Sequence, residues 1–234
     1  ISFYERKHRY PIHYVGNPTA EEVEQFKAGQ HQSFEAFCHD NQLDNRPVIA
    51  LLAGSRRQEV KDNLPAMIEA ASAFKDKYQL VLAKAPSLDD DYYAPFLKGK
   101  DIKAVSDKTY ALLSHSTAAL VTSGTATLET ALFGVPQTVC YKTPVPRLIR
   151  FAFNHVLKVR FISLVNLIAD REVVSELFAE RFSVAQIRDD LRSILPGGSR
   201  REAMLQGYDD VASRLGHTSA PDNAARIMVK LLKG

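Results

Sequence analysis

Several motifs that would point to a common enzyme class are missing from this 234-residue sequence. There is no Walker motif and no GxGxxG after a predicted strand, so neither a P-loop nor a dinucleotide site is indicated. There is no GxSxG nucleophile turn, and the seven histidines are scattered without an HExxH or similar cluster, which disfavours a zinc site. No apolar run approaches the ~20 residues needed to span a bilayer, and no signal peptide is visible.

Cysteine is scarce as well. Cys38 and Cys140 are far apart and belong to no cluster with metal-ligand spacing, so we expect a reduced, cytosolic setting and no metal. The net charge of +3 only weakly favours an anionic ligand or a membrane surface, and it gives no case for nucleic acid. Apolar residues make up 45% and charged residues 24%, so a soluble domain with a sizeable core is expected.

From residue 46 onward, short apolar runs alternate with helical patterns. Strands are predicted over 47–52, 80–83, 102–105, 118–121 and 137–141. Helices are predicted between them over 58–74, 89–97, 108–115 and 125–133, the first with Pro65 inside it. Solid apolar strands that alternate with helices indicate a parallel sheet covered on both faces. Right-handed crossovers then give an α/β fold with a doubly wound, Rossmann-like sheet.

A tight turn, Ser123-Gly124-Thr125, lies where the predicted strand 118–121 ends and the predicted helix 125–133 begins. Backbone N–H groups at a helix start have no partner within the helix, and the helix dipole is positive there. Such a turn suits a phosphate or a sugar hydroxyl group. The alternative is that Ser123 or Thr125 is only an N-cap and Gly124 only a turn residue.

A second turn of this kind, Gly54-Ser55-Arg56, follows the first predicted strand. Because ligands of doubly wound sheets bind outside the carboxyl ends of the strands, we expect both turns at one sheet edge. The Arg56 guanidinium is suited to a diphosphate, and is otherwise a surface arginine. Glu129 is placed to accept both hydroxyls of a ribose, or is a favourable charge near a helix start. Asn166 either hydrogen-bonds a phosphate or sugar, or is a satisfied polar group in a buried turn.

The remaining segments are less regular. We predict a short strand over 11–15 and one helix over 20–40. The segment 144–160 has the pattern of an apolar helix with basic flanks, which suits an anionic membrane surface, a second domain or a dimer contact. Further helices are expected to start at 170–172 and to run over 183–195, 199–215 and 221–232.

Five stretches carry a family resemblance. They are Phe3-Tyr4 with Tyr14 to Pro18, Leu51 to Val60, Ser123 to Glu129, Pro136 with Tyr141-Lys142, and Ser163 to Ala169. In this order they resemble lipid-A-disaccharide synthase, the glycosyltransferase that joins two acylated glucosamines in lipid A assembly. The family usually has Pro where Ala53 and Val165 stand here and His where Asn17 stands, which affects loop stiffness more than chemistry.

The resemblance implies a two-domain transferase of the GT-B type. Residues 1–18 would be the last strand of a missing amino-terminal acceptor domain, 19–45 a linker helix, 46–198 the UDP-sugar-binding Rossmann-like domain, and 199–234 helices that cross to the other domain or subunit. The sequence has no initiator Met, so we expect a fragment. The general base would lie in the missing domain, so no catalytic residue is assigned here and the fragment is expected to be inactive alone.

The resemblance also implies the chemistry. UDP-2,3-diacylglucosamine would donate its sugar to 2,3-diacylglucosamine 1-phosphate with inversion and without metal or cofactor. The enzyme would be peripheral on the cytoplasmic face of the inner membrane, with a homodimer as an option. The UDP-sugar-binding residues, carried over position by position, would be Gly54, Ser55, Arg56, Ser123, Gly124, Thr125, Glu129, Tyr141 and Asn166.

Two other functions stay open at this point. A UDP-sugar epimerase or a peptidoglycan-type transferase would bind a similar donor, but would place more acids and histidines in the cleft. A non-catalytic binding or assembly module would use the segment 144–160 and the terminal helices as its interface. Such a module would dimerise without affinity for a nucleotide.

Overall fold

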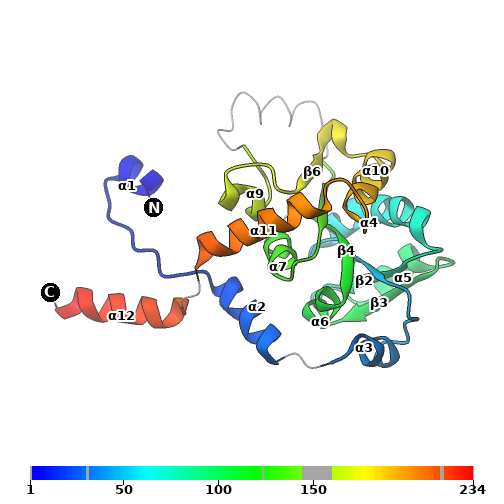
Figure 1. The fold of residues 1–234 in the computed structure, drawn as a ribbon, viewed down its shortest axis with the longest axis horizontal. Helices are drawn as coiled ribbons and strands as arrows, with labels where there is room; N and C mark the ends of the chain where they lie inside the picture. The colour runs from blue at the N-terminus through cyan, green and yellow to red at the C-terminus, as the bar shows by residue number, and fades with distance from the viewer. Residues whose placement is uncertain (1, 30–31, 123, 144–159, 217–218, 234) are drawn as a thin grey trace.

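A six-stranded parallel sheet forms the centre of the protein (Figure 1). The computed structural model describes residues 2–29, 32–122, 124–143, 160–216 and 219–233. The strands are β1 (Val48–Leu52), β2 (Gln79–Lys84), β3 (Ile102–Ser106), β4 (Ser116–Val121), β5 (Gln137–Tyr141) and β6 (Ser175–Phe178). Their order is β3-β2-β1-β4-β5-β6, and all neighbouring pairs are parallel. The prediction of a doubly wound, Rossmann-like sheet is therefore confirmed.

Helices cover both faces of this sheet. On one face the core includes α4 (Arg57–Ala71), α5 (Asp90–Leu97) and α10 (Val184–Ile194), and on the other α3 (Phe34–Asp40) and α6 (Thr109–Ser114). The other described helices are α1 (Ser2–His8), α2 (Pro18–Gly29), η1 (Ser72–Phe74), α7 (Thr125–Leu132), α9 (Leu164–Ala169), η2 (Ala179–Arg181), α11 (Arg201–Leu215) and α12 (Ala220–Lys233).

The central strand β1 shows why the sequence pattern is solidly apolar. Ile49 and Leu51 pack into the core on the α4 side, whereas Val48, Ala50 and Leu52 pack into the core on the α3 and α6 side. All five residues are buried. A strand that is covered on both faces cannot alternate apolar and polar residues, because each face needs apolar side chains.

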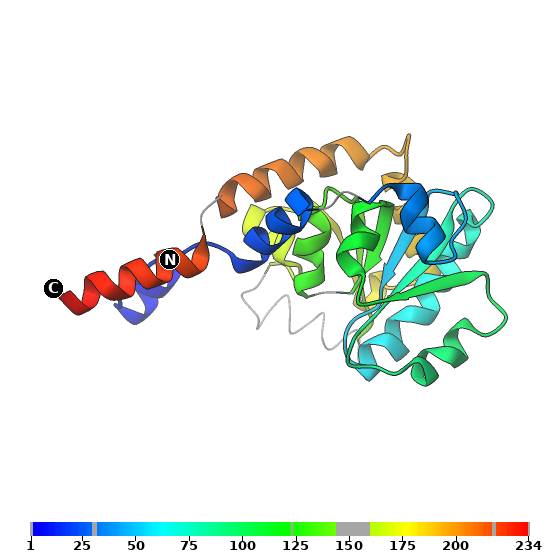
Figure 2. The ribbon, with the colours of Figure 1, turned by 90° about the horizontal axis from the view of Figure 1, so that it is seen from below.

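Segments from the two ends of the sequence lie together at one end of the molecule, where α1 and α12 reach away from the sheet (Figures 1 and 2). The Tyr14 hydroxyl donates to the carbonyl of Leu215 at 2.9 Å, and the amide of Ala220 donates to Oε2 of Glu21 at 3.0 Å. These bonds tie the segment before α2 and the first turn of α2 to the junction between α11 and α12.

Two predictions for the first forty residues were wrong. Residues 11–15 are irregular rather than a strand, because no strand among the described residues lies beside them to complete a ladder. The expected helix over 20–40 is two helices, α2 and α3. Ser33 begins α3 as its N-cap, since its side chain accepts the amide of Ala36 at 3.2 Å.

The strand β6 was not predicted, and the expected helix start at 170–172 was wrong. Asp170 has a left-handed conformation with φ of 53° and ends α9 instead. The strand that follows has only four residues and includes Glu176, so it lacks a solid apolar run. The predicted basic helix over 144–160 lies outside the described residues, apart from Arg160.

The two helices of the predicted unit 199–234 differ in burial. The helix α11 contributes buried residues such as Met204 and Val211 to the main core, so it belongs to the sheet domain. The helix α12 instead leaves Leu231 and Leu232 exposed. The predicted crossing of these helices to another domain or subunit stays a prediction.

Candidate functional site

The strands β1 and β4 end side by side at the carboxyl edge of the sheet, where the strand order reverses. The backbone amide of Thr122, directly after β4, donates to the carbonyl of Leu52, the last residue of β1, at 2.8 Å. The turns that follow these two strands are therefore neighbours. Ligands of doubly wound sheets bind at such a switch point.

The loop after β1, residues 54–56, is held by a carboxylate from the first turn of α4. Oε2 of Glu59 accepts the backbone amides of Ser55 at 3.0 Å and Arg56 at 3.4 Å, and Oε1 accepts Nη1 of Arg56 at 3.0 Å. Gly54 has φ of 104°, a left-handed conformation that favours glycine. The loop and the start of α4 are thus one hydrogen-bonded unit.

The Arg56 side chain is 82% exposed, although it pairs with Glu59. An exposed ion pair is worth less than ~1 kcal/mol. The guanidinium can therefore exchange this carboxylate for an anionic ligand at little cost, as its predicted role requires.

The turn after β4 begins α7. Gly124 is the N-cap with φ of 147°, and Thr125 is the first helical residue; both are exposed. The hydroxyl of Thr127 donates to the carbonyl of Gly124 at 2.8 Å, which braces this end of the helix. The positive end of the α7 dipole faces the same edge as the loop after β1. Ser123 lies outside the described residues.

The two turns line one pocket of about 400 Å³, which is within the size range of small-molecule sites. Its walls include Gly54, Ser55, Arg56, Gly124, Thr125 and Glu129. The prediction that both turns share one sheet edge is confirmed. The predicted binding of a UDP-sugar by these residues stays a prediction.

Lys84 is a pocket residue that the sequence analysis did not select. It is the last residue of β2, its side chain is 14% exposed, and Nζ lies 2.5 Å from Oδ1 of Asp90. Its position at the end of a predicted strand was the available signal, because all parallel strands end at this edge. Lys84 adds a second cation to the pocket wall.

Glu129 lies on α7 one helical turn after Thr125, and its carboxylate accepts the hydroxyl of Tyr110 from α6 at 3.2 Å. Burial raises the pKa of the Glu129 carboxyl above its ordinary value. The hydrogen bond from Tyr110 opposes this rise in pKa, whereas the nearby carboxylate of Glu22 adds to it. Glu129 is thus a partly desolvated acceptor on the pocket wall.

Two of the predicted site residues are not brought to the pocket lining. Tyr141 is the exposed last residue of β5, two strands away from β1. Asn166 is fully buried in α9. Neither residue contributes to the walls of the pocket between the two turns.

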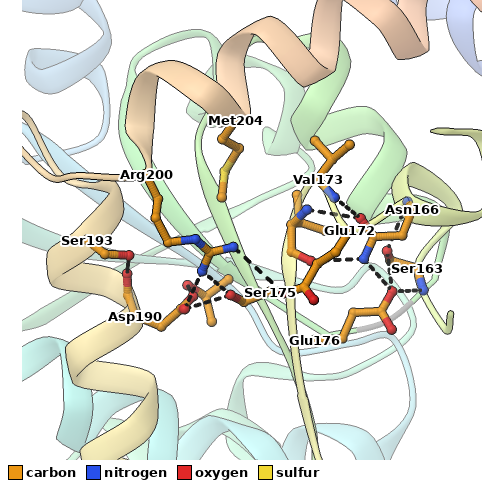
Figure 3. A network of polar contacts seen from close by, with 12 residues as sticks. Ser163, Asn166, Glu172, Val173, Ser175, Glu176, Asp190, Ser193, Arg200 and Met204 are labelled. Atoms are coloured by element: carbon orange, nitrogen blue, oxygen red, sulfur yellow. Dashed lines mark hydrogen bonds and ion pairs between the residues drawn. The ribbon is translucent and has the colours of Figure 1, made fainter. Parts of the chain in front are cut away.

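Asn166 is instead the centre of a buried network (Figure 3). Its Nδ2 donates to the carbonyl of Val174 and to Oε1 of Glu176, both at 2.9 Å. Its Oδ1 accepts the amides of Val173 at 2.7 Å and Val174 at 3.0 Å. Both polar atoms of this buried side chain thus have two hydrogen-bond partners, so the structure favours the alternative in which Asn166 is a satisfied polar group.

A second network in Figure 3 joins α10 to the sheet. The buried carboxylate of Asp190 accepts hydrogen bonds at 2.6 Å from Thr138 of β5, Ser175 of β6 and Arg200. These hydrogen bonds tie α10 and Arg200 to the last two strands of the sheet.

No group of histidine, cysteine or acidic side chains in the described part of the chain is arranged to hold a metal ion. Within the same residues, no helix combines the length and apolar character of a membrane span.

The overall arrangement is similar to that of several solved structures. The S. aureus MnaA–UDP co-structure aligns with a TM-score of 0.62 at 11% identity, covering 94% of this chain and 54% of that one. WaaG, a glycosyltransferase involved in lipopolysaccharide biosynthesis, aligns with a TM-score of 0.52 at 17% identity, covering 95% and 53%. These likenesses show a Rossmann-like α/β fold, which corresponds to about half of each of these structures.

Curated relatives are closer in sequence. Lipid-A-disaccharide synthase of Myxococcus xanthus is 35% identical over 225 residues, which is 94% of this chain and 57% of the relative. The Geobacter sulfurreducens enzyme of the same name is 31% identical over 237 residues, or 99% of this chain and 60% of the relative. The chain therefore spans less than two thirds of the length of these relatives. The family model for lipid-A-disaccharide synthetase matches residues 1–227, so the chain belongs to the lipid-A-disaccharide synthase family.

Proposed function

We propose that this chain is the donor-binding half of a glycosyltransferase of lipid A biosynthesis. The observation that carries the proposal is the single pocket in which the Gly54–Arg56 loop and the start of α7 meet. The pocket combines an exposed cation, a positive helix end and a carboxylate, which match a diphosphate and a sugar. Family membership makes UDP-2,3-diacylglucosamine the expected donor.

Three kinds of group in the pocket lining would hold the UDP part: cations, backbone N–H groups and a carboxylate. Arg56 and Lys84 would pair with the diphosphate, and the N–H groups at the start of α7 would donate to it. Glu129 would accept the ribose hydroxyls. The proposed binding set is thus Gly54, Ser55, Arg56, Lys84, Gly124, Thr125 and Glu129, with Ser123 beside them in sequence; the predicted contacts of Tyr141 and Asn166 are not included.

The same groups would assist the chemistry. When the sugar leaves UDP, negative charge grows on the diphosphate, and the cations and N–H dipoles of the pocket would stabilise it. This makes a metal unnecessary for the departing group. The general base and the acceptor, 2,3-diacylglucosamine 1-phosphate, would belong to another part of the enzyme, with inversion at the anomeric carbon. Catalysis would take place on the cytoplasmic face of the inner membrane.

Calorimetric titration of the chain with UDP tests the proposal. We expect weak binding and no turnover, and we expect Arg56→Ala to reduce the binding free energy by about 1–3 kcal/mol. Arg57→Ala is the matched control, because Arg57 is one residue away but lies over the Tyr92 ring at 4.7 Å and outside the pocket lining. No binding by the unchanged chain, or equal losses for the two arginines, would overturn the proposal.

A UDP-sugar epimerase is the second candidate. The UDP-GlcNAc 2-epimerase of Neisseria meningitidis, solved bound to UDP-GlcNAc, shares the fold with a TM-score of 0.51 at 16% identity. A panel of donors separates the two candidates. Tighter binding of UDP-GlcNAc than of the acylated donor would favour the epimerase.

A further inference from the structure

Glu59 occupies a position on the pocket wall that the proposed binding set does not use. It is the third residue of α4, its side chain is 17% exposed, and it lines the pocket beside Arg56. Each of the three hydrogen bonds of its carboxylate comes from the loop after β1. Glu59 therefore links the start of α4 to the Arg56 guanidinium.

The residue before α4 explains why Glu59 is needed. Arg56 is the N-cap, and an arginine side chain has no acceptor with which to cap a helix. Serine, threonine, aspartate or asparagine would normally stand at this position. The carboxylate of Glu59 instead reaches back from the first turn of the helix and accepts the amides of Ser55 and of Arg56 itself.

Gly54 makes room for this carboxylate. A Cβ at position 54 would lie 2.4 Å from Oε2 and 2.7 Å from Cβ of Glu59. The loop and Glu59 are thus matched to one another, and a side chain on Gly54 would exclude the carboxylate from its place.

We propose that Glu59 is a positioning residue for the diphosphate of the ligand. Its Oε2 fixes the backbone of the loop, and its Oε1 holds the Arg56 guanidinium beside the pocket. When the ligand binds, the guanidinium leaves Oε1 and pairs with the phosphates. Holding the long arginine side chain near its bound position reduces the entropy lost when a ligand binds. This inference rests on the proposed function and goes beyond it by assigning a role to a residue that does not touch the ligand.

The test is a calorimetric comparison of UDP with uridine, which lacks the diphosphate. We expect Glu59→Ala to weaken UDP binding about fivefold and to leave uridine binding unchanged within error, because Glu59 acts through Arg56. In an Arg56→Ala background, Glu59→Ala should weaken UDP binding by less than it does in the unchanged chain, because only its support of the loop backbone remains. Glu59→Gln keeps an acceptor for the loop amides without the charge, so a smaller loss is expected. The control Glu69→Ala removes the same charge from an exposed site on the same helix and should have no effect.

The outcomes separate the possible failures. Unchanged or tighter UDP binding by Glu59→Ala would overturn the role of Glu59, and tighter binding would show that it competes with the phosphates. Equal losses for UDP and uridine, or a loss in the Arg56→Ala background as large as in the unchanged chain, would show a merely structural role. If the unchanged chain binds no UDP, the proposed function is wrong, and the role of Glu59, which depends on it, is wrong as well.

Discussion

The Tyr110 hydroxyl donates to Oε1 of Glu129 at 3.2 Å and so joins α6 to α7 at the wall of the pocket. Tyr110 is itself fixed by ring contacts with Phe26 and Phe133, at centroid distances of 5.4 and 5.2 Å. The carboxylate is therefore oriented by packed aromatic residues before a ligand arrives. Such pre-organisation lowers the cost of binding.

The pKa of Glu129 predicts how the stability depends on pH. Burial raises the pKa of Glu129 in the folded state above its value in the unfolded chain. The proton on Glu129 therefore contributes its full stabilisation below the unfolded-state pKa. This stabilisation is lost as the pH rises through the folded-state pKa. We expect Glu129→Gln, which keeps an acceptor for Tyr110, to match the unchanged chain near pH ~4 and to exceed its melting temperature near neutrality. Glu69→Gln, at an exposed site, is the control and should show no such difference. A lower melting temperature for Glu129→Gln at neutral pH would contradict this expectation.

Replacing Asn166 should affect stability rather than binding. Asn166→Ala would leave the amides of Val173 and Val174 without their acceptor and would remove one of the donors to the Glu176 carboxylate. We expect the free energy of unfolding in denaturant to fall by about 2–4 kcal/mol, with little change in UDP affinity. Exposed Asn45→Ala should change neither quantity. Normal stability with a large loss of UDP affinity would show instead that Asn166 contacts the ligand.

Two glycines with positive φ provide a matched pair. Gly54 and Gly99 have φ of 104° and 73°, but only at Gly54 would a Cβ meet other atoms, those of Glu59. We expect Gly99→Ala to cost about 1–2 kcal/mol of unfolding free energy from the left-handed backbone alone. Gly54→Ala should cost more and should also weaken UDP binding. Equal losses of stability with unchanged UDP affinity would mean that Glu59 can move aside freely.

The helix α12 should make the chain self-associate. It leaves Leu231 65% and Leu232 86% exposed, with Met228 also exposed on the same helix. An apolar helix face in water favours association with another copy or another domain. Sedimentation velocity should show concentration-dependent association that Leu231→Glu with Leu232→Glu reduces and that Lys230→Ala does not. A chain that stays monomeric at all concentrations would rule out this role for α12.

Much of the fold could be predicted because burial on both faces forces solid apolar strands such as 48–52. The strand β6 could not be predicted, because its polar side chains bond to residues that are distant in the sequence. Ser175 bonds to Asp190, and Glu176 accepts the amides of Ile162 and Ser163 at 2.9 Å. These partners are distant in sequence and leave no local pattern.

The site was predictable to the extent that it depends on strand ends. The turns after β1 and β4 meet as expected, because parallel strands end at one edge. The role of Asn166 was not decidable, since a buried amide suits a ligand or the protein equally well. Glu59 was not selected, because its role depends on the backbone conformation of Gly54, which the sequence alone does not specify.

A crystal structure of the chain soaked with UDP tests the central proposal most directly. We predict that the diphosphate lies between the Arg56 guanidinium and the N–H groups at Gly124 and Thr125, with the ribose hydroxyls on Glu129. A nucleotide that binds well but lies elsewhere, with the pocket between the two turns empty, would contradict it.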